Sequence, residues 1–330
     1  MPLEGLEDRY VNFYTDFAFK KLFGTEVNKE LLRSFLNSLL AGQEVITNLT
    51  YLNSEQLGAQ EIDRKAVFDV YCENERGEKF IVEMQKAEQQ FFKDRSVFYS
   101  TFPIREQAQP GRGWDYQLKS VYTIGILNFS FDDSDPEYFH HEVKLMDTRT
   151  KNVFYDKLTF IYLEMPKFTK TEDQLVTMFD KWLYAIKHLP ALMDRPKALY
   201  EKVFEQFFRA AEIAKFTRKE MAAYEGSLKV YWDWYSVFKT AKEQSFTEGR
   251  AEGRAEGRAE GRAEGRAEGR AEGRAEGRAE GLAEGLREGE KNKAFSIAKE
   301  MLADGMCPEH VARYTNLTQE EILQIAEENK

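Results

Sequence analysis

The sequence of 330 residues predicts an α/β fold, and three observations support this prediction. Residues 1 to about 130 alternate between helical and strand-like apolar patterns, as α/β domains do. Two of the strand-like runs flank Glu75-Arg76-Gly77, which has the length and the glycine position of a hairpin loop. The composition, 42% hydrophobic and 32% charged, is that of a globular protein.

Helices and strands are expected in a definite order. The first helix is predicted to begin at Thr15 or Asp16 and to end before Gly24, and Asn28 is expected to cap the second. Strands are predicted at about 45–57, 65–73, 79–85, 120–129, 141–147 and 154–163. The further helices are predicted at about 88–107, 172–188, 198–216 and 218–243.

The chain is expected to divide into four zones. Residues 1–130 form an α/β core, and residues 131–247 form an extension of strands and helices packed on it. Residues 248–291 are a low-complexity repeat, and residues 292–330 are a small helical tail. In the tail, Pro308 is expected to open one helix, and Thr318 with Glu321 forms the capping box of another. Such a tail fits either a helix-turn-helix or an assembly cap.

The repeat consists of eight copies of Glu-Gly-Arg-Ala followed by three variant copies. On a helix, this spacing places like charges at i,i+4, where they repel, and each glycine costs about 1 kcal/mol relative to alanine. An isolated helix of this sequence is therefore expected to be weak. Two interpretations remain: a helical stalk whose Gly and Ala stripes pair two chains into a homo-oligomer, or a flexible spacer.

Composition and charge narrow the class of protein. The formal net charge of -10 argues against a generally basic protein that coats DNA, although it leaves room for a local basic patch. The sequence has no run of about 18 apolar residues and no signal peptide, so a cytoplasmic protein without a membrane partner is expected. The two cysteines and four histidines have no metal-ligand spacing, which argues against a zinc site.

The predicted hairpin brings together residues that carry chemistry. With the loop at residues 75–77, Asp69 lies directly opposite Glu83. Strand alternation then places Asp69, Glu83 and Gln85 on one face. The other face is expected to be an apolar surface made by Phe68, Val70, Cys72, Phe80, Val82 and Met84.

Two carboxylates that face each other across a sheet repel. A solvated sheet edge tolerates such a pair, but a divalent cation such as Mg²⁺ or Mn²⁺ offers a better resolution, because hard cations bind carboxylate oxygens. A bound cation would polarise a phosphoryl oxygen and activate a water molecule. Gln85, two residues beyond Glu83, is expected to orient that water or a phosphate.

The hairpin resembles the active centre of a known nuclease superfamily. Asp69, a hairpin of this length and Glu83-Met84-Gln85 look like the D…(D/E)xK core of the PD-(D/E)XK nucleases. The chain is similar in particular to the Rpn family of recombination-promoting nucleases and transposases, through the segment 15–24, the Glu-Gly repeats and the helical tail. The resemblance covers most of the chain, most sharply residues 14–130. It implies a restriction-endonuclease-like core in residues 1–130, with a mixed central sheet flanked by helices.

The resemblance also implies roles for single residues. Asp16, on the first helix, would join Asp69 and Glu83 as a metal ligand. Gln85 stands where the superfamily usually has lysine, and alternation points Lys86 to the other face. Lys65 shares the odd-numbered face and is therefore expected to supply the missing positive charge near the reacting phosphate.

The helix after the hairpin offers candidates for DNA binding. Arg95 and Tyr99, one turn apart, resemble basic and aromatic positions of the family and would hold a phosphate or the scissile strand, with Arg105 as a further contact. Alternatively, Tyr99 packs in the core and Arg95 pairs with an acid. A later aromatic stripe is expected to be core: Tyr231, Trp232, Trp234, Tyr235 and Phe238.

Two functional hypotheses follow. The first is a metal-dependent DNA endonuclease that hydrolyses phosphodiester bonds, with recombination or transposition implied by the resemblance. The second is a catalytically weak or inactive DNA-binding or assembly protein that retains the nuclease fold and oligomerises through its repeat. A nuclease that acts on RNA would use the same site.

Overall fold

The computed structural model describes residues 8–43, 45–56, 66–87, 89–109, 115–131, 135 and 137–328. The chain forms two compact units, Met1–Phe238 and Lys239–Lys330. No helix in the described part of the chain is both long and apolar enough to cross a membrane.

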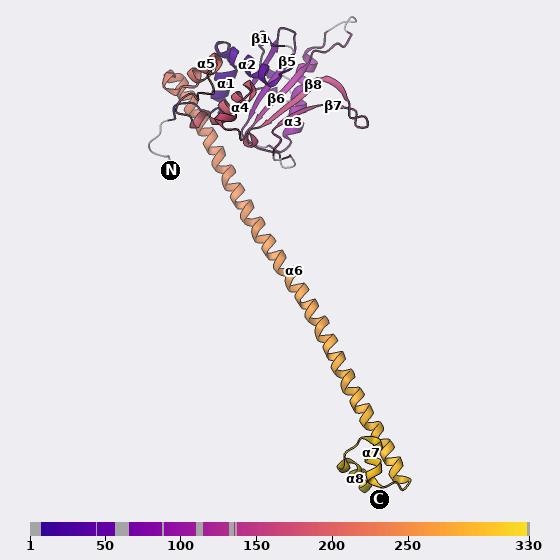
Figure 1. The fold of residues 1–330 in the computed structure, drawn as a ribbon. Helices are drawn as coiled ribbons and strands as arrows, with labels where there is room; N and C mark the ends of the chain where they lie inside the picture. Colours follow the sequence, from indigo (N-terminus) through magenta and orange to yellow (C-terminus); the bar gives the residue numbers. More distant parts are fainter. Residues whose placement is uncertain are drawn as a thin grey trace. The chain divides into compact units, whose positions relative to one another are not determined.

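A mixed six-stranded sheet forms the centre of the first unit (Figure 1), and it confirms the α/β prediction. The strand order is β1-β4-β5-β6-β8-β7; β5, β6 and β8 are parallel, and the other neighbours pair antiparallel. The strands are β1 (Leu49–Tyr51), β4 (Val70–Asn74), β5 (Lys79–Gln85), β6 (Val121–Leu127), β7 (His140–Met146) and β8 (Val153–Glu164). A separate two-stranded sheet consists of β2 (Glu55–Gln56) and β3 (Ala66–Val67).

Helices cover both faces of the large sheet (Figure 1). The helices on one face are α1 (Asp16–Phe23), α2 (Lys29–Leu39), α4 (Met178–His188) and α5 (Lys202–Ala211). The other face is covered by α3 (Phe92–Glu106), where Phe102 packs with Ile81 and Phe92 packs with Leu127.

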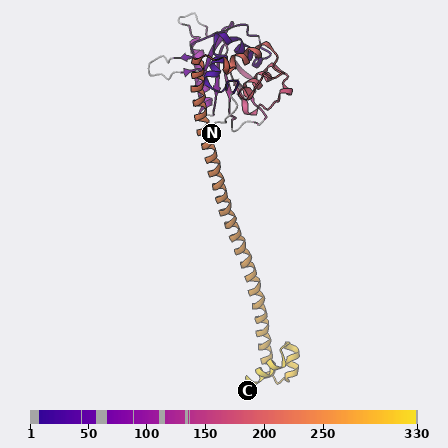
Figure 2. The same ribbon diagram turned by 90° about the vertical axis from the view of Figure 1, so that its left-hand side faces the viewer.

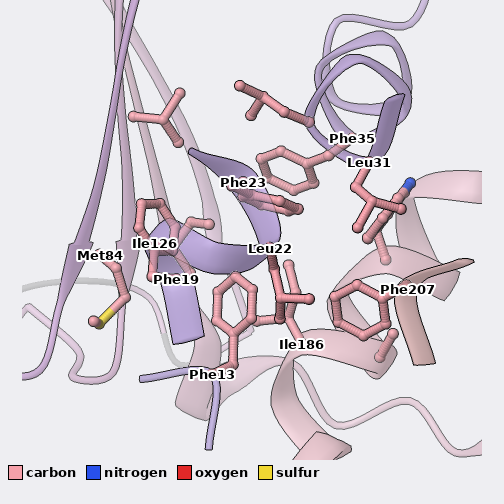
Figure 3. Close-up of a cluster of buried hydrophobic side chains, with 14 of the residues drawn as sticks. Phe13, Phe19, Leu22, Phe23, Leu31, Phe35, Met84, Ile126, Ile186 and Phe207 are labelled. Carbon is pink, nitrogen blue, oxygen red and sulfur yellow. The ribbon is translucent and has the colours of Figure 1, made fainter. Parts of the chain in front are cut away.

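The main core lies between the sheet and the four-helix layer (Figure 3). Met84 and Ile126 reach it from the sheet, and Phe19, Ile186 and Phe207 reach it from the helices. All but Met84 of these five are fully buried, and burial of each such side chain contributes roughly 1.5–3 kcal/mol. This layer fixes the position of β5, the strand that carries Glu83 and Gln85.

The two predicted helix starts have different outcomes. Thr15 caps α1, since its Oγ1 accepts a hydrogen bond from the Ala18 N–H at 3.3 Å. The prediction that Asn28 caps α2 is wrong, because its side chain donates to the Lys21 carbonyl instead, at 2.8 Å. A 3₁₀ turn, Glu26–Asn28, precedes α2 and directs this side chain back toward α1.

Two predicted strands are each divided in the structure. The segment predicted at 45–57 forms β1 and β2, which belong to different sheets, and the segment 65–73 forms β3 and β4. Because the strand is interrupted at Phe68 and Asp69, alternation does not continue through them. Phe68 therefore packs with Tyr71, Ile81 and Phe102 on the α3 face, and its assignment to the opposite apolar face was wrong.

The boundary predicted at residue 130 falls between β6 and β8, which pair in parallel within one sheet. The predicted helices at 172–188 and 198–216 are shorter than expected, because separate 3₁₀ turns occupy part of each segment. The 3₁₀ turns after β8 are Met165–Lys167, Glu172–Gln174, Leu189–Ala191 and Ile213–Lys215. Thr177 and Asp180 form a capping box that starts α4 late, at Met178.

The last long helix, α6 (Arg218–Ala303), begins in the first unit and contains the repeat. Its N-terminal turns belong to the first unit (Figure 2), and there the Asn12 N–H, just before α1, donates to the Tyr224 hydroxyl at 3.0 Å. Residues 239–293 are exposed throughout.

In the second unit, the end of α6 packs with α7 (Pro308–Thr315) and α8 (Gln319–Glu328) around Ala298, Val311 and Ile322. Pro308 opens α7, and Thr318 and Glu321 hydrogen-bond reciprocally before α8.

Candidate metal centre

The two carboxylates Asp69 and Glu83, here called the acid pair, lie where β4 separates from β5. The two strands pair up to Val70↔Val82, in the register predicted for a loop with Gly77 at positive φ (78°). At the next residue, hydrogen bonds from the main chain to side chains take the place of the hydrogen bonds between the two backbones. Asp69 Oδ2 accepts a hydrogen bond from the Met84 N–H at 2.9 Å, and Glu83 Oε1 accepts one from the Asp69 N–H at 3.2 Å. Each carboxylate is thus held by the main chain next to the other.

Gln85 and Gly125 complete the immediate surroundings of Glu83. Gln85 Nε2 lies 3.3 Å from Glu83 Oε2 and donates to it, and both side chains are more than nine-tenths buried. On the neighbouring strand Glu83 pairs with Gly125. A Cβ atom there would lie 3.2 Å from both the Leu127 side chain and the Tyr162 ring, so glycine allows these side chains to pack closely over the strand next to Glu83.

Burial and mutual repulsion make the two carboxylates hold protons more tightly than usual. Burial raises the pKa of Glu83 to about 8, and the charge of Asp69 adds to the effect. Burial also raises the pKa of Asp69, although its hydrogen bond from Met84 opposes the shift. The negative charge of Asp16 raises it further. The site therefore favours a proton or a cation.

Lys86 supplies positive charge at the site, contrary to the prediction that it points to the other face. It lines a cavity of about 300 Å³ together with Asp69, Glu83 and Gln85. Because β5 ends at Gln85 and the chain bends there, strand alternation does not apply to Lys86. Burial lowers the pKa of Lys86, against the charges of Asp16 and Asp69, which raise it. Lys65 lies outside the described residues, so its role stays a prediction.

Arg95 and Tyr99 line the same cavity from α3. Arg95 lies over the Tyr99 ring at 5.5 Å and donates a hydrogen bond to Gln89. Its charge lowers the pKa values of both carboxyl groups and so opposes the effect of burial. Tyr99 also packs edge-on against Phe68, with ring centroids 5.4 Å apart, so it serves the core and the cavity at once.

Arg105 is exposed in the last turn of α3, roughly 15 Å along the helix axis from Arg95 at 1.5 Å per residue. It lines neither of the cavities beside the acid pair. Its predicted contact with DNA therefore stays a prediction.

Asp16 approaches the pair from another side. It lines a second cavity of about 790 Å³, which Asp69 and Lys20 also line. Asp16 is half-exposed and forms an ion pair with Lys20 at 2.9 Å. In the described part of the chain, no three His, Cys, Asp or Glu side chains gather as a metal-ligand cluster, so its role as third ligand stays a prediction. The i,i+4 spacing from Asp16 was the signal that could have identified Lys20.

The aromatic stripe of α6 is only partly core, so that prediction was largely wrong. Tyr231 is buried, but Trp232, Tyr235 and Phe238 are 53%, 42% and 43% exposed. Trp234 is intermediate in exposure and lines the acid cavity. No local sequence pattern links Trp234 with a hairpin about 150 residues earlier, so only the fold reveals this contact.

The residues present fit a divalent cation. Carboxylate oxygens are the ligands that Mg²⁺ and Mn²⁺ prefer, and each oxygen has more than one lone pair, so the hydrogen bonds described above do not exhaust them. A dication would also relieve the repulsion between Asp69 and Glu83 that the raised pKa values reflect. The chain can therefore contribute at least two anionic ligands, one from the residue before β4 and one from β5.

One comparison with known proteins found a match, to the model of a protein family. A search of curated proteins and a search of solved structures found no match. The model of one family, described as PD-(D/E)XK nuclease family transposase, matches residues 13–241. That segment contains the whole six-stranded sheet, the acid pair and the first turns of α6. The chain therefore belongs to the PD-(D/E)XK nuclease family of transposases.

Proposed function

We propose that this protein is a metal-dependent endonuclease that hydrolyses phosphodiester bonds in DNA, with Mg²⁺ or Mn²⁺ held by Asp69 and Glu83. One observation carries the proposal: a buried carboxylate, Glu83, and a half-buried one, Asp69, are each hydrogen-bonded to the main chain beside the other, and their pKa values are raised. A structural ion pair would place a basic partner in contact with each acid. Here the acids face each other, and the arrangement favours a cation from solution.

When bound, the cation supplies Lewis acidity toward a phosphoryl oxygen and lowers the pKa of a water molecule. The chain does the rest. Asp69 and Glu83 are held rigidly by the Met84 and Asp69 amides, and Gln85 fixes the orientation of the Glu83 carboxylate. Lys86 and Arg95 attract the phosphate into the cavity and balance charge that develops on it.

The biological context comes from the family, whose members are nuclease-like transposases. We propose that cleavage serves DNA transposition or recombination. Asp16 would assist as an outer ligand from α1, since it shares the second cavity with Asp69.

Plasmid cleavage tests this function. Supercoiled plasmid is incubated with the full-length protein and Mg²⁺ or Mn²⁺, beside Asp69→Ala, Glu83→Ala and the control Glu142→Ala, an exposed acid on β7. The wild type and the control are expected to nick or linearise the plasmid. The two site variants are expected to lose about 10³-fold in rate, or about 4 kcal/mol of transition-state stabilisation. If the wild type leaves the plasmid as intact as both site variants do, the protein is not a nuclease.

A second proposal concerns assembly. The glycines of the repeat, from Gly249 to Gly289, lie in open space on the exposed part of α6, and an isolated helix of this sequence is intrinsically weak. We infer that the repeat pairs with a second copy of the chain. Deletion of residues 248–291 is expected to halve the number of chains per particle, calculated from the mass that light scattering measures. An unchanged number of chains per particle contradicts this proposal and leaves the nuclease proposal intact.

A further inference from the structure

The cavity beside the acid pair has aromatic side chains from two helices. Tyr99 of α3 and Trp234 of α6 line it together with Asp69 and Glu83. Trp234 is stacked on Phe238, with ring centroids 5.2 Å apart and planes inclined by 23°. Phe238 covers one face of the Trp234 ring, and the rest of this partly exposed ring lines the cavity.

The Trp234 ring is not needed to attach α6 to the core. The attachment is made one and three turns earlier by Tyr231 and Tyr224, which are 8% and 3% exposed and belong to the main core. Beyond them the aromatic side chains become exposed, and Trp234 faces the cavity. Exposed aromatic rings at such a position are costly in water and therefore favour a ligand with an aromatic face.

The same helix lines both cavities that contain Asp69. Glu220, Ala223 and Ser227 line the larger cavity, and Trp234 lines the smaller one. The helix rises roughly 21 Å between residues 220 and 234 at 1.5 Å per residue. One wall thus extends past the acid pair in both directions.

Positive charge lies close to this wall. Lys86 and Arg95 line the smaller cavity, and Lys20 and Lys21 line the larger one. Lys20 and Lys21 are paired with Asp16 and Glu220, respectively. Among the described residues, Lys86 and Arg95 form no ion pair with an acid; Arg95 donates a hydrogen bond to Gln89 and lies over the Tyr99 ring. Both side chains line the smaller cavity, where they can meet the phosphates of a bound strand.

We propose that the site takes a single DNA strand, with an unpaired base stacked on Trp234 and the adjacent phosphates bound by Lys86 and Arg95. The substrate class is therefore single-stranded or locally melted DNA, an assignment that rests on the proposed function of Asp69 and Glu83. Stacking on a side chain requires an uncovered base face, whereas neighbouring bases cover both faces within a duplex. Cations beside aromatic rings are the usual composition of single-strand sites.

The test measures binding without cleavage. A labelled oligonucleotide of mixed sequence, as a single strand and as its duplex, is titrated with the full-length protein in the presence of a chelator, and fluorescence anisotropy is read. Trp234→Ala is expected to weaken single-strand binding about tenfold and duplex binding less than twofold. Trp232→Ala is the matched control on the same helix, because Trp232 is exposed and lines neither cavity.

A second variant guards against a simple folding defect. Trp234→Phe retains an aromatic ring and is expected to retain most of the single-strand affinity, with a melting temperature close to that of the wild type. Equal losses for single strand and duplex in Trp234→Ala overturn the inference, as do equal losses in Trp234→Ala and Trp232→Ala.

The two proposals fail separately. A protein that cuts duplex plasmid through Asp69 but binds single strands independently of Trp234 contradicts only the single-strand inference. A protein that binds single strands through Trp234 and leaves DNA intact with Mg²⁺ contradicts the nuclease function, while the binding surface stands.

Discussion

Two buried glutamates lie near the carboxyl ends of parallel strands in the same sheet, and their surroundings are opposite. Glu164, the last residue of β8, is fully buried and contacts His141 at 2.6 Å and Lys167 at 2.8 Å. Glu83 on β5 is 8% exposed, and it is hydrogen-bonded to the main chain of another acid, Asp69, whose charge raises the pKa of Glu83. The sheet aligns the two regions, since Gln85 pairs with Leu127 and Leu127 pairs with Glu164.

The difference shows how one sheet edge holds both a structural and a functional carboxylate. Around Glu164 the chain supplies its own cation, so the charge is neutralised within the protein. Around Glu83 the cations Lys86 and Arg95 line the same cavity, and among the described residues neither forms an ion pair with the carboxylate. A buried acid without its own counter-ion requires a proton or a ligand. Glu83 therefore belongs to a binding site, and Glu164 belongs to the scaffold.

The largest expected effect concerns the scaffold glutamate. Glu164→Gln leaves Lys167 and His141 without their buried anion and is expected to reduce the free energy of unfolding by about 3 kcal/mol. Urea denaturation measures this loss, and Glu142→Gln, an exposed acid paired with Lys144, serves as the control with a change below about 0.5 kcal/mol. If Glu164→Gln has the same free energy of unfolding as the wild type, Glu164 is not a structural ion-pair partner and its contrast with Glu83 is wrong.

The next effect concerns the pH dependence of stability in metal-free protein. Because the folded-state pKa of Glu83 is raised above its unfolded value, its protonation stabilises the folded state. This stability is fully present below the ordinary carboxyl range and is lost as the pH rises toward about 8. We expect the free energy of unfolding to fall by about 2 kcal/mol between pH 5 and 8.

Glu83→Gln identifies the source of that slope. The variant cannot ionise, so its stability curve is expected to be flatter over the same range, whereas Glu142→Gln keeps the wild-type slope. Denaturation measured with a chelator at several pH values decides between these outcomes. If the free energy of unfolding of Glu83→Gln depends on pH as strongly as that of the wild type, the pKa of Glu83 is not raised by its surroundings.

The smallest expected effect concerns Lys86. Lys167 forms an ion pair with Glu164, whereas Lys86 only lines the cavity beside the acid pair. Lys86→Met is expected to lower the cleavage rate about tenfold, or about 1.4 kcal/mol, because a positive charge next to the phosphate is lost. Stability is expected to change little, since burial of this lysine already disfavours its charged form. Lys93→Met is the control, because Lys93 lies over the Phe131 ring.

Much of the site could be predicted from the hairpin alone. A short loop with glycine at the left-handed position fixes the register, and the register brings Asp69 beside Glu83. Alternation correctly grouped Glu83 with Gln85, because both lie within an uninterrupted strand. Alternation failed for Phe68 and Lys86, since the strand breaks at one position and has ended at the other.

Other features depend on contacts between distant parts of the chain. Trp234 reaches the cavity beside Asp69 and Glu83 because α6 packs there. Strand β8 pairs with β6, although the boundary between the first two zones was predicted at residue 130, between these strands. Glu164 was not recognised at all, because its partners His141 and Lys167 come from the neighbouring strand and from the turn after β8. Local patterns predict single elements well, but they do not encode which elements meet.

The most direct test of the acid pair is a calorimetric titration of the full-length protein with Mn²⁺ near pH 7.5. The wild type is expected to bind the cation, and Asp69→Asn and Glu83→Gln are expected to lose that binding by at least tenfold, because each removes an anionic ligand. Glu164→Gln, titrated under conditions where it is folded, is expected to retain it. Equal Mn²⁺ affinity in the wild type and in both acid-pair variants would contradict the assignment of this site as the metal centre.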